Sequence, residues 1–329
     1  GIDRTEATLT FNQTLEWGGD REARTQLAVR QGSRVRALGD VARQDLLHDV
    51  EVAYVDVQRA QAALQVAEER LALAREVAAT VQRRVEAARD PLLASSRSNT
   101  LVADAEIAVE NAQLADAAAR DHLATYWGGA SNFQVDTSTF SAVSGLFVDS
   151  ASLAPEIAVA RAAQQEAEAR IAVERARSTL DPTVSAGLRY FRDGSEAAFV
   201  VGFSIPLGVN DDNSGAVARA SAESSRARLE AEVLQRNIER QAASARSQMN
   251  IAAREIVAID ERLIPAAEEA VERARDGYNQ GGFSYLDVLD AQRVLSTARL
   301  QRISALDSYH RARTALKRLL GGYAAGAAQ

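Results

Sequence analysis

The chain has 329 residues with 38 basic and 45 acidic side chains, a formal net charge of −7, and only 5% aromatic residues. The charges are spread along the chain rather than gathered into a basic patch, which argues against nucleic acid as a partner. Cysteine is absent and the histidines are few and isolated, so thiolate catalysis, disulfide bonds and cysteine-based zinc sites are excluded, and we predict neither a metal site nor a cofactor. The composition is typical of long helices, and no apolar run reaches the length of about 18 residues that would predict a membrane-spanning helix.

The first predicted element is a strand over residues 7–17. Leu9, Phe11, Leu15 and Trp17 alternate with polar side chains, which is the two-residue period of a strand. Its length of about eleven residues suits a tilted strand that crosses a bilayer, although an amphipathic strand of a soluble sheet has the same pattern. The other strands of the chain must decide between these two interpretations.

A helical hairpin is predicted over residues 24–127, followed by an irregular linker over 130–153. Asp90 is expected to cap the return helix, with Pro91 at its first position. The first helix, of about 65 residues at about 1.5 Å each, would be about 100 Å long. It carries two interleaved rows at heptad spacing, one of them mostly alanine, as at a coiled-coil seam. These rows are Val57, Leu64, Leu71, Ala78 and Val85, and Ala60, Ala67, Ala74, Val81 and Ala88.

The second half begins with a predicted helix over residues 155–180, which is followed by strands over 183–191 and 197–207. Apolar and polar residues alternate in both strands, and the Asp-Gly pair in residues 192–195 predicts a hairpin loop between them. Arg189 lies on the polar side of its strand, where it would face the lumen of a barrel or simply water.

A second helical hairpin is predicted over residues 214–320. Pro265 should interrupt or bend its first helix. The heptad rows of that helix are expected to continue past the proline. They are Met249, Ile256, Leu263 and Ala270, with Ala245, Ala252, Ile259 and Ala266 beside them.

The order of strand, long helix, tip, return helix and Gly-Gly therefore occurs twice. Gly128 and Gly321 begin the equivalent Gly-Gly pairs and are 193 residues apart. We divide the chain into a first repeat over residues 1–150 and a second over 151–329. The helix and strand at the start of the second repeat have no counterpart in the first, so we expect at least about 40 residues of the first repeat to be missing.

The tip of the second hairpin has a distinctive sequence between Tyr278 and Asp290. Gly281 and Gly282 end one helix, and Ser284 begins the next, with Asp287 as the acid of a capping box. Asp287 and Asp290 are three residues apart, hence neighbours on one helix face. The first tip, at Arg89, Asp90 and Pro91, has no such aspartate pair.

These residues resemble the outer membrane efflux protein (TolC) family. The segment from Tyr278 to Gly281 and the run from Leu286 to Ala291 are similar to the hallmark of that family's second repeat, and the exit Leu15-Glu16-Trp17-Gly18-Gly19 resembles its heavy-metal CzcC-like branch. The resemblance implies a mixed fold of coiled-coil helices and membrane strands: a homotrimer with a 12-stranded outer-membrane β-barrel, four strands per chain, continued by a long periplasmic α-helical barrel.

The resemblance also implies the function and location. The chain would be the exit channel of a tripartite efflux system in the outer membrane of a Gram-negative bacterium, with most of its length in the periplasm. Its partners would be a periplasmic adaptor, an inner-membrane RND pump and outer-membrane lipid, and its cargo divalent heavy-metal cations. Drug efflux and type I protein secretion remain alternatives, as does a soluble coiled-coil scaffold. No nucleophile and base pair or phosphate loop is present, so we predict no enzyme.

Several site residues follow from the resemblance, each beside a structural alternative. Asp287, Asp290 and Tyr278 would form the periplasmic gate, Tyr278 as a latch between coiled coils. Asp287 could act only as a helix cap, Asp290 only as an ion-pair partner of Arg293, and Tyr278 only as seam packing. The tips that would dock the adaptor are Arg89, Asp90, Pro91, Gly281, Gly282, Phe283 and Ser284. Phe283 departs from the basic residue of some family members, which weakens any latch built on a charge there.

Overall fold

The computed structural model describes residues 6–143, 154–191, 196–206 and 213–323. They form two compact units, one of Gly1–Ala42 with Ser152–Asn237 and one of Arg43–Ala151 with Ile238–Gln329. Each unit therefore takes residues from both predicted repeats. Helices α1 (Asp20–Glu86) and α5 (Ser214–Ala258) each have residues in both units.

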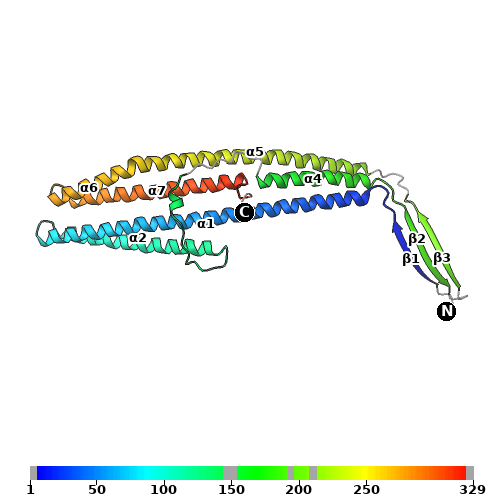
Figure 1. The fold of residues 1–329 in the computed structure, drawn as a ribbon, viewed down its shortest axis with the longest axis horizontal. Coiled ribbons are helices and arrows are strands. Elements are labelled where there is room, and N and C mark those ends of the chain that lie inside the picture. Colours follow the sequence, from blue (N-terminus) through cyan, green and yellow to red (C-terminus); the bar gives the residue numbers. More distant parts are fainter. Residues whose placement is uncertain (1–5, 144–153, 192–195, 207–212, 324–329) are drawn as a thin grey trace. The chain divides into compact units, whose positions relative to one another are not determined.

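The first unit contains an antiparallel sheet with strand order β1-β2-β3 (Figure 1). The strands are β1 (Glu6–Thr14), β2 (Thr183–Phe191) and β3 (Glu196–Ser204). Leu9 pairs with Leu188, which pairs with Phe199, so the apolar residues predicted for each strand share one face of the sheet, and all three of these side chains are exposed. On the opposite face Arg189 Nε donates to Thr8 Oγ1 at 3.2 Å.

Both outer strands are shorter than predicted at their carboxyl ends. The strand predicted to reach residue 17 ends at Thr14, because the chain then turns and Trp17 donates its backbone N–H to Asp181 Oδ1 at 3.0 Å. The strand predicted to reach residue 207 ends at Ser204, two residues before Pro206, which has no N–H to donate. The predicted loop at 192–195 and Leu207 itself lie outside the described residues.

Helix α4 (Pro155–Ala176) lies in the first unit, which also contains the amino-terminal parts of α1 and α5. Arg30 Nη1 donates to Gln165 Oε1 at 3.0 Å, and Arg34 Nη1 lies 3.2 Å from Glu166 Oε2. The predicted end at residue 180 was four residues too far, because Ser178 and Thr179 form turn hydrogen bonds to Arg175 and Ala176 instead of continuing the helix.

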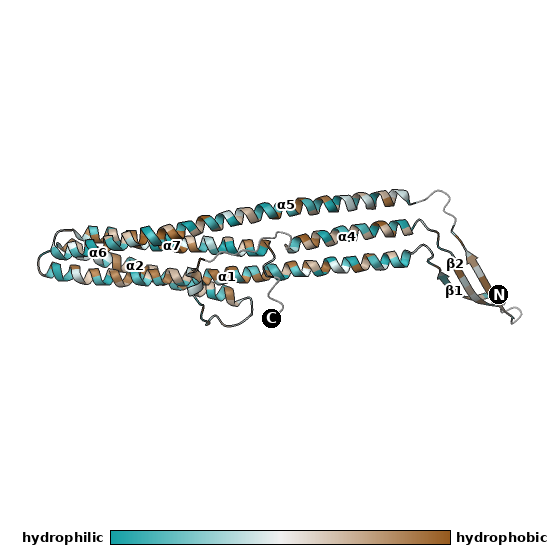
Figure 2. Ribbon diagram, turned by 45° about the horizontal axis from the view of Figure 1, so that its top comes forward, coloured by the Kyte–Doolittle hydropathy of each residue, from teal (hydrophilic) through white to brown (hydrophobic). Residues whose placement is uncertain are grey.

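The second unit contains the tips and the return helices of the two predicted helical hairpins (Figure 1). The first joins α1 to α2 (Leu92–Ala124), and the second joins α6 (Ile264–Gln280) to α7 (Tyr285–Leu319). The largest hydrophobic core of the second unit includes Ile256, Leu306 and Tyr309. The segment predicted as a linker contains a short helix, α3 (Ser138–Ser141), and its Phe140 packs in the same core. Hydrophobic residues lie among hydrophilic ones along the helices (Figure 2), and in the described parts of the chain no helix combines the length and apolarity needed to cross a membrane.

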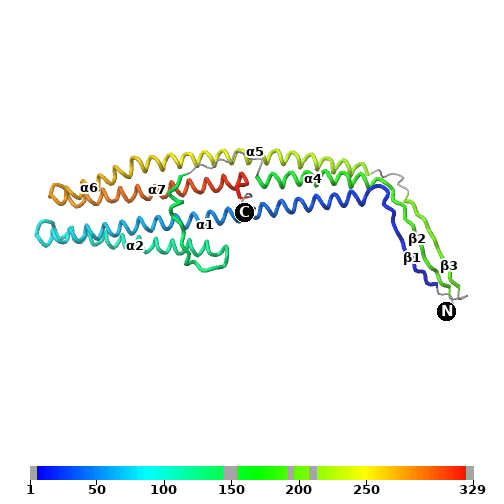
Figure 3. The backbone as a smooth tube through the Cα atoms, viewed as in Figure 1, coloured from blue at the N-terminus to red at the C-terminus, as the bar shows by residue number. Residues whose placement is uncertain are grey.

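Between α5 and α6 the helix widens into a π-turn, η2 (Ile259–Leu263), in which the Ile264 N–H bonds to the carbonyl of Ile259, five residues back. The backbone nevertheless continues from α5 into α6 as one helical path (Figure 3). Pro265 therefore interrupts the regular α-helix as predicted.

The heptad rows predicted past Pro265 are wrong. Leu263, Ala266 and Ala270 are exposed, whereas Ala267 and Val271 are buried. The extra residue in the π-turn rotates everything that follows by about 100°, one residue of a helix with about 3.6 residues per turn.

Candidate functional site at the hairpin tips

The two hairpin tips of the second unit begin with the same backbone motif. At the end of α6, Gly281 has φ 82°, its N–H bonds to Tyr278 O at 3.0 Å, and the Gly282 N–H bonds to Gly277 O at 2.8 Å. At the end of α1, Ala88 has φ 55°, its N–H bonds to Val85 O at 2.9 Å, and the N–H of the next residue bonds to Arg84 O at 2.8 Å. Both are Schellman motifs. The equivalent residues, Ala88 and Gly281, are separated by the offset of the predicted repeat.

The first motif carries backbone strain that the second avoids. An alanine in the left-handed region costs about 1–2 kcal/mol, of which the greater unfolded-state freedom of glycine cancels about 0.5–1 kcal/mol. We therefore expect Ala88→Gly to raise the free energy of unfolding of the second unit by about 0.5–1 kcal/mol. Chemical denaturation followed by circular dichroism measures this, with exposed Ala87→Gly as a control that should not stabilise.

Asp90 does not cap α2. Pro91 occupies the N-cap position with φ −69° and no side-chain cap bond, and α2 begins one residue later, so the predicted capping role is wrong. Asp90 instead accepts hydrogen bonds from Arg84, Nε to Oδ2 at 3.0 Å and Nη2 to Oδ1 at 3.2 Å. The motif at Ala88 turns the chain back, so the carboxylate lies over the last turn of its own α1 helix.

Arg84 also binds the second hairpin. Its Nη1 donates to the backbone carbonyl of Tyr278 at 2.9 Å, and its guanidinium carbon lies 4.4 Å from the centre of the Tyr278 ring. A cation at this carbonyl is favourable because it lies at the carboxyl end of α6. The Tyr278 hydroxyl in turn donates to Asp90 Oδ2 at 2.5 Å. Arg84, Asp90 and Tyr278 thus form a closed three-residue network, which we call the tip network.

Tyr278 packs in the seam and also forms a hydrogen bond to the other hairpin. Its ring is 4% exposed and packs with Val77, Val81 and Val288, while its hydroxyl reaches the other hairpin. Burial and the hydrogen bond to Asp90 raise the pKa of Tyr278, so its phenol stays protonated and keeps donating. Burial alone raises the pKa of the neighbouring Tyr285 to about 12.

The pKa of Asp90 predicts how the tip network responds to acid. Burial opposes ionisation of Asp90, but the hydrogen bonds from Arg84 and Tyr278 and the charge of Arg84 outweigh it, so its pKa lies below the ordinary value. A lowered folded-state pKa means that the stabilisation is complete above the unfolded-state pKa and is lost as pH falls through the folded-state pKa. The tip network should therefore be unchanged from pH 8 to about 5 and should weaken only below about pH 4.

Spin labels on cysteines replacing the exposed residues Arg89 and Asn279 would measure this acid response, since the chain has no cysteine of its own. The distance between the labels should stay constant down to about pH 4 and broaden below it. In an Asp90→Asn variant the distance should be independent of pH. A transition near neutral pH would contradict the assignment of this response to Asp90.

At the second tip, the predicted capping box is confirmed. The Ser284 N–H and hydroxyl donate to Asp287 Oδ2 at 2.8 and 2.7 Å, and Ser284 is the N-cap of α7. These hydrogen bonds from Ser284 lower the pKa of Asp287. Asp290 is also exposed but has no hydrogen-bond or ion-pair partner among the described residues, so the alternative of a pair with Arg293 is not observed. Asp290 lines a groove of about 570 Å³ together with Leu101 and Leu289.

The remaining predicted tip residues are mostly exposed. Arg89 and Gly282 lie at the surface, and the Phe283 ring, 51% exposed, covers Gly277 so closely that a Cβ there would lie 2.2 Å from it. His310 is buried far along α7, with Nε2 2.8 Å from the Phe140 carbonyl oxygen, and burial lowers its pKa. Within the described ranges no three acidic or histidine side chains are grouped so as to hold a metal ion.

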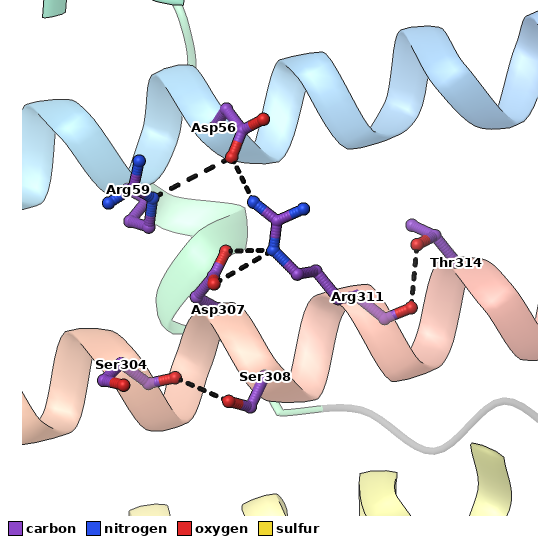
Figure 4. A network of polar contacts seen from close by, with 7 residues as sticks. All are labelled: Asp56, Arg59, Ser304, Asp307, Ser308, Arg311 and Thr314. Atoms are coloured by element: carbon purple, nitrogen blue, oxygen red, sulfur yellow. Dashed lines mark hydrogen bonds and ion pairs between the residues drawn. The ribbon is translucent and has the colours of Figure 1, made fainter. Parts of the chain in front are cut away.

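Ion pairs also join the two hairpins away from the tips. Arg311 of α7 binds Asp307 through Nε at 3.0 Å and contacts Asp56 of α1 (Figure 4). Lys317 of α7 lies 2.6 Å from Glu51 of α1. Other pairs have the same polarity, with the acid on α1 and the base on α6 or α7: Glu69 with Arg299, Glu76 with Arg275, and Asp45 with Arg318. This one-way arrangement favours the observed alignment of the hairpins, although each exposed pair contributes at most about 1 kcal/mol.

A family model described as "Outer membrane efflux protein" matches residues 1–129 and 146–322. The chain belongs to this family. The family has a transport role, and membership confirms both the predicted family and the predicted location in the outer membrane of a Gram-negative bacterium.

Proteins that are similar in sequence to this chain are named for resistance to metals. The chain is 28% identical over 321 residues to the cobalt-zinc-cadmium resistance protein CzcC of Cupriavidus metallidurans, covering 96% of this chain and 77% of that protein. It is 30% identical over 250 residues to the nickel and cobalt resistance protein CnrC of the same organism, covering 74% of this chain and 59% of that protein.

Solved structures confirm the predicted TolC-like fold. The outer membrane protein VceC of Vibrio cholerae matches with a TM-score of 0.79 at 20% identity, over 95% of this chain and 79% of that one. CusC, described as forming a transmembrane channel, matches with a TM-score of 0.78 at 18% identity, over 97% of this chain and 84% of that one. At this level of identity the likeness concerns the fold alone.

Arg84 is the tip residue that sequence reasoning missed. A basic residue in the last turn of a helix is a general stabilising feature, and Arg83 has it equally. Their roles differ because Arg84 points towards the second hairpin, whereas Arg83 is exposed and donates to Thr80 of its own helix at 3.2 Å. Arg84 and Asp90 lie close in sequence on either side of a helix end, and this spacing could have predicted a pair between them. Asp90 was instead predicted to be a helix cap, so the pair was not considered.

Proposed function

We propose that this chain is the outer-membrane exit channel of a tripartite efflux system whose cargo is divalent heavy-metal cations. The observation that carries the proposal is the family match over nearly the whole chain, together with similarity to proteins named for resistance to cobalt, zinc, cadmium and nickel. An exit duct need not bind what it passes, so the proposal requires no metal-binding cluster in the chain.

The assembled state belongs to the same proposal. Outer membrane efflux proteins of tripartite systems work with an adaptor and an inner-membrane RND pump, and we assign this chain a homotrimer whose strands share one barrel in contact with lipid. The exposed apolar face at Leu9, Leu188 and Phe199 suits contact with acyl chains. Arg89, Pro91, Gly282 and Phe283, exposed at the tips, would meet the adaptor.

The tips would also form the gate. The tip network ties the end of α6 to the end of α1 and so holds the second hairpin against the first. Asp290, exposed and unpaired among the described residues, would contribute one carboxylate per chain to a ring that selects cations. Asp287 would keep its capping bonds and add charge near the same constriction.

Metal tolerance of a deletion strain tests the cargo. Loss of the gene should raise sensitivity to Co, Zn, Cd or Ni, and a plasmid copy should restore tolerance, whereas sensitivity to hydrophobic drugs should not change. Unchanged metal tolerance together with drug hypersensitivity would refute the metal cargo and favour a drug duct. Failure of the purified protein in detergent to form a trimer would refute the proposed assembly.

A further inference from the structure

The buried positions along α5 and α6 change phase at the π-turn η2. Before the turn they follow steps of three and four residues, and after the turn they do so again, but the interval from Ile259 to Ala267 is eight residues instead of seven. The half-buried Ile264 lies five residues after Ile259 instead of four. These buried positions are Ala245, Met249, Ala252, Ile256 and Ile259, then Ala267, Val271, Ala274 and Tyr278. The π-turn therefore inserts one residue into the helix.

This extra residue decides which side chain reaches the tip network. Without the phase change, the steps of three and four from Ile259 would lead to Leu263, Ala266, Ala270, Arg273 and Gly277. Gly277 would then face the first hairpin, and Tyr278 would be turned away by about 100°. The hydroxyl that donates to Asp90, and the ring on which Arg84 lies, would both be removed from the first hairpin.

Two features hold the π-turn in place. Arg302 of α7 binds Asp260 in a bidentate pair, Nε to Oδ1 at 2.5 Å and Nη2 to Oδ2 at 3.1 Å. Pro265 has no N–H, and in a continuous α-helix its ring would collide with the carbonyl of Glu261 four residues earlier. The wider turn before the proline avoids that collision.

We propose that η2 is the device that positions Tyr278 for the tip network, and that Asp260, Arg302 and Pro265 are positioning residues acting on a contact at the far end of α6. The proposal deepens the proposed function, since it concerns the same gate. The π-turn sets the direction in which Tyr278 points around the axis of α6. Deleting or inserting a single residue changes this direction.

Deletion of Glu261, an exposed residue of the turn, combined with Pro265→Ala to remove the collision of the proline ring, should convert the π-turn into a regular α-turn and keep Tyr278 on its present face. Adding one alanine between Glu272 and Arg273 to that deletion restores the native length but rotates Tyr278 away. Hydrogen exchange of the full-length protein in detergent reports the result in peptides 84–92 and 276–284. The Tyr278→Phe variant gives the exchange rate expected when only the hydroxyl hydrogen bond is lost. Exchange in peptide 306–320 reports whether the core around Tyr309 stays intact.

The deletion with Pro265→Ala should leave exchange at the tips within about twofold of the parent, whereas the same variant with the inserted alanine should speed it about tenfold, at least to the level of Tyr278→Phe, with peptide 306–320 unchanged in both. Faster tip exchange in the variant without the inserted alanine, with peptide 306–320 still protected, would overturn the proposal. So would protected tips in both variants.

If the deletion loses protection throughout the second unit, a charge exchange decides instead. Asp260→Arg alone should speed exchange at the tips, and Asp260→Arg with Arg302→Asp should restore protection; failure of the pair to restore it would overturn the role of these residues. Because the measurement uses purified protein without cargo, its outcome is independent of which substrate the channel exports.

Discussion

Replacing Arg84 with glutamine should make the tip open far more often than in the parent protein. The change removes both hydrogen bonds to Asp90, the bond to the Tyr278 carbonyl and the stacking on its ring, and it leaves a mostly buried carboxylate without its cation. Hydrogen bonds to charged groups contribute about 1.5–3 kcal/mol each, and partial exposure together with the surviving Tyr278 bond reduces the net loss to about 2–3 kcal/mol. The open fraction in planar-bilayer recordings should rise about 30- to 150-fold.

The matched control is Arg83→Gln. Arg83 is the preceding residue, with the same charge and the same position near the end of α1, but its described contact is with Thr80 of its own helix. A general effect of removing a cation from the helix end would appear equally in both variants. If Arg83→Gln opens the channel as much as Arg84→Gln does, or if neither changes it, the tip network does not hold the gate closed.

The sequence predicted the tips well wherever a backbone rule determined the outcome. Gly281 was expected to end α6 and Ser284 with Asp287 to start α7, and both features are observed because they depend only on residues close in sequence. Asp90 was assigned wrongly for the same reason. A local capping rule could not anticipate that Arg84 and Tyr278, the second of them 188 residues away, offer its carboxylate stronger hydrogen bonds than the free N–H groups of α2.

The phase of α6 was unpredictable for a different physical reason. Leu263, Ala266 and Ala270 are as apolar as Ala267, Val271 and Ala274, so either row could form a seam. Pro265 indicated an interruption but not its type, since a kink and an added residue are both compatible with proline. The bidentate pair between Asp260 and Arg302 favours the added residue, and it joins positions that only the folded hairpin brings together.

Mutation of the two acids of the second tip should show that Asp287 stabilises the fold and that Asp290 does not. Asp287→Asn should lower the melting temperature, because the carboxylate accepts both capping bonds from Ser284, and Ser284→Ala should cost about 1 kcal/mol of stability at the same helix end. Asp290→Asn should leave the melting temperature unchanged, because the exposed carboxylate has no described partner whose bond would be lost.

In channel recordings we expect the opposite: the substitution at Asp290 should have the larger effect on ion selectivity. In a trimer Asp290→Asn removes three charges from the proposed constriction and should lower the preference for cations over anions by about threefold or more, with the effect shrinking at high salt because free ions screen the ring. Ser284→Ala keeps every carboxylate and serves as the control for a weakened helix start without a change in charge. Equal selectivity in the parent and Asp290→Asn proteins would mean that the carboxylate lies outside the ion path, and Asp290 would then be a surface residue of the groove beside Leu289.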